Sequence, residues 1–205
     1  MEMATTKYKI NKEYTFLEFK EIVTNLVSSG KSSGEETAER IEATKINSQR
    51  INRIYKTFLP SDATQNVVNK LKEDWDWLLL LESWCGDGAQ LSPIIAKIAE
   101  LNPHIHLKII FRDEHEDIMN MHLTNGAKSI PKLICLDSIS HRYIGEWGPR
   151  PIAIQEKVKE FKTANPNVSH EEFVKNLHLW YAQDKGLSFE KEFVALIENW
   201  DKNKM

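Results

Sequence analysis

One short apolar run in the middle of the chain constrains the fold more than any other feature. Residues 77–81 are one tryptophan and four leucines, and they follow a charged segment. A run of this length that is apolar at every position is typical of a strand buried on both faces of a sheet. The run therefore predicts a sheet that has helices above and below it.

The segments that follow this run alternate between strand and helix patterns. They are predicted to be a helix over 86–101, a strand over 104–111, a short helix over 113–123, a hairpin of strands over 133–136 and 143–145, and a helix over 152–162. Pro93 lies inside the first helix as a kink. This order is typical of α/β proteins, and it predicts a sheet of four or five strands.

Both ends of the chain read as helical. Thr15 with Glu18, Ser33 with Glu36, and Ser169 with Glu172 each have the capping-box spacing that marks the start of a helix. Asp62 is predicted to cap a further short helix that ends near residue 72. The chain thus divides into an N-terminal helical extension over 1–73, an α/β domain over 74–163, and a C-terminal helical extension over 164–205 that packs on the core.

Composition excludes several classes of protein. The 205 residues carry 27 basic and 30 acidic side chains, a balance that favours neither nucleic acid nor an anionic membrane as a partner. The longest apolar stretch is about half of what a membrane span needs, and residues 1–7 lack the pattern of a secretory signal. With only two cysteines, we expect a cytoplasmic protein in a reducing compartment. The seven histidines form no closed ligand set, so no metal site is predicted.

Cys85 is the candidate reactive group. It falls where the buried strand ends and the next helix begins, among unpaired N–H groups at the positive end of the helix dipole. In comparable settings the pKa of a cysteine falls from about 8.5 to roughly 3.5–7.5, which favours the nucleophilic thiolate. The other thiol, Cys135, is interpreted as core packing.

The motif residues resemble those of the thioredoxin superfamily. Trp84-Cys85-Gly86 is similar to its active-site motif, and Ile130-Pro131, 46 residues after the cysteine, is similar to its cis-proline landmark. With Asp87 and the later Trp147-Gly148-Pro149-Arg150-Pro151 segment, the chain is similar to a bacterial group of thioredoxin-like proteins. The resemblance covers residues 74–161 and implies a thioredoxin-like fold, a central mixed sheet flanked by helices.

Three departures from the family pattern affect the expected chemistry. Gly88 stands where thioredoxins have their second, resolving cysteine, and Leu79 stands where they have a buried acid. Cys135 lies four residues beyond Pro131 on an extended strand, about 13 Å away, whereas a disulfide tolerates Cα separations of only about 7 Å. Asp87 replaces a proline; its charge opposes ionisation of the thiol, and it either stabilises the helix start or acts as a local acid or base.

The resemblance implies a monothiol thiol–disulfide oxidoreductase with Cys85 as its nucleophile. The expected substrate-binding residues are Trp84, Gly86, Asp87, Ile130 and Pro131. No cofactor is expected beyond an external thiol, such as glutathione, that resolves the mixed disulfide. Expected partners are a disulfide-containing protein or a small thiol, and the chain is expected to be a monomer or a weak homo-oligomer.

Several alternatives stay open at this point. The chain could be a redox-inactive binding module with a thioredoxin fold, or a sensor that is oxidised at its single reactive cysteine. Trp84 is either a lip of the binding site or a packing residue. Arg112 either binds a ligand carboxylate or forms a surface ion pair.

Overall fold

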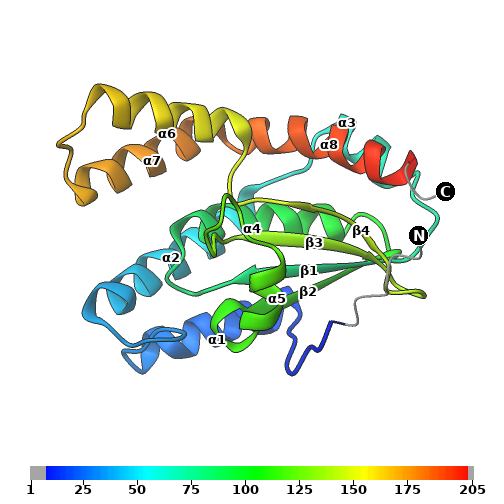
Figure 1. Ribbon diagram of the computed structural model, residues 1–205, viewed down its shortest axis with the longest axis horizontal. Helices are drawn as coiled ribbons and strands as arrows, with labels where there is room; N and C mark the ends of the chain where they lie inside the picture. The colour runs from blue at the N-terminus through cyan, green and yellow to red at the C-terminus, as the bar shows by residue number, and fades with distance from the viewer. Residues whose placement is uncertain (1–7, 203–205) are drawn as a thin grey trace.

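The computed structural model describes residues 8–202 (Figure 1). The expectation about a secretory signal concerns residues 1–7, which lie outside the described part of the chain. Among the described residues, no helix combines the length and apolar character that a membrane crossing requires.

The centre of the molecule is a four-stranded mixed sheet in the order β2-β1-β3-β4. Its strands are β1 (Trp75–Leu81), β2 (Ile105–Phe111), β3 (Lys132–Asp137) and β4 (Tyr143–Trp147). Strand β1 runs parallel to β2 and antiparallel to β3, and β3 pairs antiparallel with β4. Every residue of β1 is buried. The sheet and the helices around it confirm the predicted α/β fold, a mixed sheet flanked by helices.

Helices surround the sheet and extend to one side of it as two arms (Figure 1). They are α1 (Phe16–Ser28), α2 (Ala38–Thr57), α3 (Asp62–Val68), α4 (Gly86–Ala99), α5 (Glu116–Met121), α6 (Ile152–Ala164), α7 (His170–Asp184) and α8 (Leu187–Lys202). The pair α1 and α2 forms one arm, and the pair α6 and α7 forms the other.

The two faces of β1 contribute to separate apolar clusters because alternate side chains point to opposite faces of a strand. Trp77 and Leu79 belong to the main core, which also takes in side chains of α1 to α4 and the C-terminal helices. Trp200 of α8 reaches the same core and packs edge-on against Trp75. Leu80, on the other face, belongs to a smaller cluster with residues of α5.

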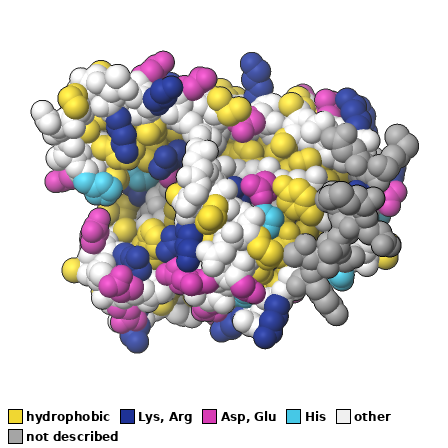
Figure 2. All heavy atoms as spheres, in the orientation of Figure 1, with side chains coloured by type: hydrophobic (Ala, Val, Ile, Leu, Met, Phe, Trp, Pro, Cys, Tyr) yellow, Lys and Arg dark blue, Asp and Glu magenta, His cyan; other side chains and the backbone are white. Residues whose placement is uncertain are grey.

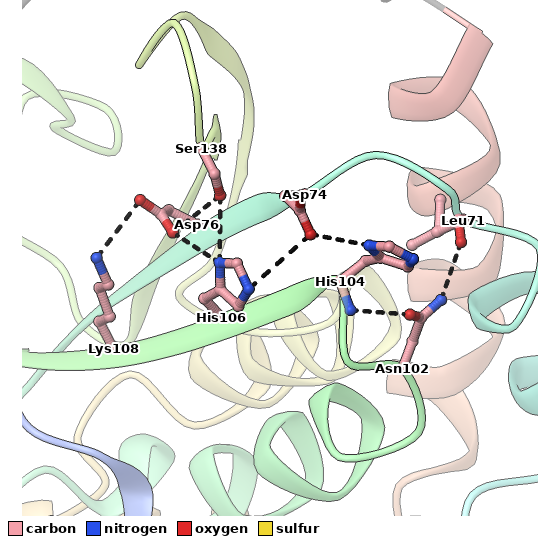
Figure 3. A network of polar contacts seen from close by, with 8 residues as sticks. All are labelled: Leu71, Asp74, Asp76, Asn102, His104, His106, Lys108 and Ser138. Carbon is pink, nitrogen blue, oxygen red and sulfur yellow. Dashed lines mark hydrogen bonds and ion pairs between the residues drawn. The ribbon is translucent and has the colours of Figure 1, made fainter.

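A network of polar side chains lies near the beginning of β1 and β2 (Figure 3). Asp76 of β1 contacts His106 at 3.3 Å and Lys108 at 3.4 Å, both on β2, and accepts a hydrogen bond from Ser138. His104 contacts Asp74 at 2.8 Å. Over residues 8–202, no group of three or more His, Cys, Asp or Glu side chains could hold a metal ion.

The capping boxes in the sequence predicted some helix starts correctly and others wrongly. The capping box of Thr15 and Glu18 is present at the start of α1, as predicted. The box predicted at Ser33 and Glu36 is wrong: α2 begins after Thr37, whose hydroxyl accepts from Arg40 N, while the Ser33 hydroxyl donates to the Glu82 carboxylate.

Two other predicted elements also differ from the structure. Helix α3 is capped by Ser61, which precedes the predicted cap Asp62. The helix predicted over 113–123 is broken into a 3-10 turn (Arg112–Glu114) and α5, because His115 between them leaves helical backbone angles.

Candidate thiol site at the start of helix α4

Cys85 is the N-cap residue of α4. Its Sγ accepts a hydrogen bond from the Gly88 N–H at 3.3 Å, in the position where an N-cap side chain satisfies an orphan backbone donor. The thiol in turn donates to the carbonyl oxygen of Ile130 at 3.4 Å. The Ile130–Pro131 peptide bond is cis. The fold thus brings together the motif and the proline segment, which are 45 positions apart in the sequence.

The environment of Cys85 keeps its thiol protonated. Only 7% of the residue is exposed, and burial raises the pKa of the thiol to about 12, with the Asp87 carboxylate adding to the shift. The Gly88 N–H and the Arg150 guanidinium act in the opposite direction but do not cancel the loss of hydration. The expectation that the helix start lowers this pKa is therefore wrong, because the sulfur is desolvated as well as capped.

Asp87 is a buried, paired carboxylate. Its two oxygens share the single N–H of Arg150 Nε, at 2.9 and 2.8 Å, and Arg150 Nη2 lies 2.6 Å from Oδ2. The Tyr181 hydroxyl donates to the same carboxylate at 2.7 Å. Asp87 is thus neither a free surface charge nor only a helix-starting acid, since it ties α4 to the start of α6 and to α7.

A glycine allows Arg150 to reach this carboxylate. Gly148 has φ +126, and a Cβ there would lie 2.2 Å from the carbonyl oxygen of Pro131. The loop after β4 therefore passes directly against the proline segment, which no other residue at 148 permits. The Trp147–Pro151 segment noted in the sequence is the means by which Arg150 is delivered to the site.

Helix α7 covers the first turn of α4 with His178. A Cβ at Gly86 would lie 3.0 Å from the His178 ring, so glycine is what lets the imidazole approach the cysteine motif. His178 Nδ1 is 3.1 Å from the side-chain nitrogen of Gln90. Burial, with the positive charges of Arg50 and Arg150, lowers the pKa of His178 to about 4.

Trp84 lies between two guanidinium groups. The Arg40 guanidinium, from α2, lies over the ring at 4.5 Å from its centroid, and that of Arg112 lies over it at 5.0 Å. Such contacts between cation and ring each contribute about 0.5–1 kcal/mol at partly exposed sites. Arg112 also pairs with Asp113 at 2.7 Å, as the ion-pair interpretation predicted, and it lines the groove between α2 and α7; binding of a ligand carboxylate by Arg112 stays a prediction.

The N-terminal arm contacts the residues just before Cys85 through hydrogen bonds from α2. The Ser83 hydroxyl donates to, or accepts from, Thr44 at 2.9 Å, and Asn47 donates to the Ser83 carbonyl at 3.0 Å. Glu82 is buried, and burial raises its pKa. Residues 82 and 83 are thus fixed by α2 and the loop before it, so the extension forms part of the site.

A groove of about 1110 Å³ opens between α2 and α7 above the start of α4. Cys85 and Ile130 lie in it, as do Trp84, Gly86 and Asp87. Figure 2 shows this side of the molecule hollowed between the two arms, with Lys, Arg and His side chains around the hollow. The groove gives a partner access to the region of the sulfur.

The positions at which the chain departs from a dithiol thioredoxin have apolar surroundings, and the second cysteine of the chain is far from Cys85 in the core. Cys135 is fully buried and belongs to the main core opposite Trp77, whereas Cys85 belongs to the smaller cluster, and neither cysteine is in a disulfide. Leu79 is fully buried in the main core. A Cβ at Gly88 would lie 2.9 Å from Leu81 Cδ2, so this position is crowded by an apolar side chain.

Four polar residues near the thiol were not predicted from the sequence. Arg50, Arg150, His178 and Tyr181 come from α2, the loop after β4, and α7. Only Arg150 carried a local signal, since it stands in the Gly-Pro-Arg-Pro segment. The others lie on amphipathic helices, where nothing in the spacing distinguishes a side chain over the site from one on the surface.

A four-stranded mixed sheet, a cysteine capping the helix that follows the central strand, and a facing cis-proline define a thioredoxin-like protein. A family model described as thioredoxin matches residues 34–162, more than half of the chain, and the chain belongs to this family. The matched range includes α2, the helix that fixes Ser83.

Two solved structures are similar to the chain. A crystal structure of an HIV epitope-scaffold is similar with a TM-score of 0.52 and 19% identity, over 90% of this chain and 97% of that one. A protein of unknown function from Pseudomonas aeruginosa aligns with a TM-score of 0.46 and 18% identity, over 83% of this chain and 98% of that one. At this identity the first likeness shows the fold alone. No curated protein matches the chain.

Proposed function

We propose that this protein is a monothiol thiol–disulfide oxidoreductase that uses Cys85. The observation that carries the proposal is the position of the sulfur: Sγ caps α4, contacts the Ile130 carbonyl, and lines a groove large enough for a substrate. A disulfide in the groove would lie beside the extended segment at Ile130 and Pro131. Trp84, Gly86 and Asp87 would form the wall around it.

The proposed reaction has two exchange steps. The Cys85 sulfur attacks one sulfur of a substrate disulfide, a mixed disulfide forms, and the other half of the substrate leaves as a thiolate that takes up the proton lost by Cys85. An external small thiol, such as glutathione, then attacks the mixed disulfide, which restores the Cys85 thiol and leaves the new disulfide in solution. The external thiol is needed because Gly88 supplies no second sulfur.

The raised pKa predicts the pH dependence of this reaction. The thiolate is the attacking form, so the exchange rate should rise with pH up to the region of the Cys85 pKa, near 12. The carboxylate of Asp87 opposes ionisation, and Arg150 favours it. Asp87→Asn removes the opposing charge and leaves the guanidinium, so it should lower the pKa of Cys85.

Alkylation across a pH series tests this proposal. In a Cys135→Ser background, the rate of iodoacetamide labelling of Cys85 should be low at neutral pH and increase about tenfold in Asp87→Asn, the effect of a pKa lower by one unit. Glu42→Gln, at the rim of the groove, is the matched control and should leave the rate unchanged. Mixed-disulfide formation with a glutathionylated peptide, followed by mass spectrometry, should vary in the same way and be absent in Cys85→Ser.

A redox-inactive binding module is the second candidate, and the protonated, buried thiol favours it. Under that alternative, Asp87→Asn alters the labelling rate, but no variant with Cys85 forms a mixed disulfide with the glutathionylated peptide at any pH. A redox sensor is less well supported, because sensor cysteines have low pKa values and are accessible to peroxide.

A further inference from the structure

The groove separates its charges by depth. Arg40, Arg50, Arg112 and Arg150 all line it, together with Lys128 and two histidines. The side chains of Arg112 and Arg150 are 17% and 25% exposed, whereas the groove carboxylate of Glu39 is 82% exposed and that of Glu42 is 61% exposed. Glu39 and Glu42 therefore lie at the rim, and the buried carboxylate of the groove, Asp87, is paired with Arg150, so the interior carries a net positive charge.

Three of these arginines already have carboxylate partners. Arg150 pairs with Asp87, Arg112 with Asp113, and Arg40 with Glu35 at 3.7 Å. Their charges are compensated within the protein.

Arg50 is the exception. Among residues 8–202 no carboxylate lies within ion-pair distance of it, and its side chain donates to the amide oxygen of Asn47 at 2.9 Å. Burial, together with repulsion from Arg53, lowers the pKa of Arg50. A partly buried guanidinium without an anionic partner costs free energy, and a bound anion would offset that cost.

A second observation places the uncompensated charge next to the thiol motif. His178 lies against Gly86, and the positive charges of Arg50 and Arg150 both act on its imidazole. Arg50 on α2 and Arg150 beside α4 thus face one region from two sides. The first N–H groups of α4, a helix of 14 residues, add their dipole to the same region.

We propose that this groove selects acidic peptide substrates, with Arg50 binding a substrate carboxylate while the substrate disulfide lies at Cys85. The selectivity rests on the proposed exchange function for its covalent step. Arginine suits this role because its planar guanidinium binds a carboxylate through two parallel hydrogen bonds. The volume of about 1110 Å³ exceeds that of an ordinary small-molecule pocket, which leaves room for several residues of a peptide.

A matched peptide series tests the selectivity. The substrates are cysteine peptides of one length, flanked on both sides by Glu, Gln or Lys and activated as 2-pyridyl disulfides, so that release of 2-thiopyridone reports attack by Cys85. The Glu peptide should react about tenfold faster than the Gln peptide, as expected for one charge-assisted pair, and the Lys peptide should be slowest. The advantage should shrink as ionic strength rises.

Variants on α2 identify the residue responsible. Arg50→Met should bring the ratio of the Glu-peptide rate to the Gln-peptide rate down to about one. Arg50→Lys, which keeps the charge but not the paired hydrogen bonds, should retain part of the advantage. Arg53→Gln is the control: it removes one positive charge from the same helix, but at an exposed position outside the groove. Equal losses in Arg50→Met and Arg53→Gln would overturn the assignment to Arg50.

The outcomes separate this inference from the exchange function. If the Glu and Gln peptides react equally fast with the wild type, selectivity is disproved and exchange stands. If no peptide reacts, exchange is disproved, and binding of the S-methylated peptides to Cys85→Ser decides selectivity by titration calorimetry. A Glu preference that is lost in Arg50→Met supports it, and equal affinities overturn it.

Discussion

At the scale of single residues, Gly88 decides what kind of redox chemistry the site can perform. A Cβ built there lies 3.4 Å from Cys85 Cβ and 3.5 Å from its Sγ. Disulfides have Cβ separations of about 3.5–4.5 Å, so the backbone is within about 0.1 Å of the geometry that a second thiol would use. Glycine at position 88 thus removes the second thiol but leaves a backbone geometry close to that of a disulfide.

We therefore expect Gly88→Cys to form an intramolecular disulfide with Cys85 on mild oxidation. The new Cβ lies 2.9 Å from Leu81 Cδ2, so Leu81 must shift, and the reduced variant should lose about 1–3 kcal/mol of stability. Thiol counting and a mobility shift on reduction measure the bond. Gly88→Ser produces similar crowding without a thiol. Oxidation of Gly88→Cys to intermolecular dimers alone would contradict the geometry.

Single residues also differ in whether their role in the site could be predicted from the sequence. The position of Cys85 was predictable from the strand and helix patterns on either side of it, and that of Pro131 from the resemblance to thioredoxins. The protonated state of Cys85 was not predictable, since it depends on how completely the folded chain removes water from the sulfur. The hydrogen bond from Tyr181 to Asp87 joins residues 94 positions apart, and no spacing along the chain indicates it.

At the scale of elements, strands were predicted more reliably than helix starts. Residues 77–81 of strand β1 are apolar at every position because both faces of the strand are buried, and that pattern survives any tertiary context. A capping box is a weaker signal, since its hydroxyl can find a better partner elsewhere. Ser33 bonds to Glu82 and Ser83 of the motif segment, and α2 starts later as a result.

The docking of α7 on α4 should depend on pH through His178. In the unfolded chain this imidazole binds its proton near pH 6.5, whereas in the folded protein its pKa is about 4. Between these values the unfolded state binds more protons, so stability is lost as the pH falls from 6.5 towards 4. We expect a loss of about 2 kcal/mol, less than the full shift implies because the ring is partly solvated.

Urea unfolding across that pH range measures this effect. His178→Gln cannot titrate and retains an amide near Gln90, so its stability should fall less between pH 6.5 and 4 than that of the wild type. His170→Gln, on the same helix with an exposed side chain, is the control and should behave like the wild type. Parallel pH curves for all three proteins would show that His178 does not carry the dependence.

At the scale of the whole molecule, the helical extensions and the sheet share one apolar core. Phe19 of α1, Trp77 of β1 and Phe193 of α8 all belong to the main cluster. Phe193 packs edge-on against Trp77 at 5.3 Å between ring centroids, and Phe19 lies 6.0 Å from Phe111 of β2. Because each extension buries its aromatic side chains against the sheet, neither should keep its structure after the sheet unfolds.

This shared core predicts one cooperative unfolding transition. Phe19 is 1% exposed, and Phe19→Ala should cost about 3–5 kcal/mol through lost burial and the cavity left behind. Far-ultraviolet circular dichroism reports the helices, and tryptophan fluorescence reports the sheet, the cysteine motif, α7 and α8, since α1 and α2 contain no tryptophan. In urea, both midpoints should fall together. Leu17→Ala, on the same helix but 60% exposed, should change stability by less than about 0.5 kcal/mol. An early loss of helical signal in Phe19→Ala, with fluorescence unchanged, would mean that the N-terminal arm unfolds independently of the sheet.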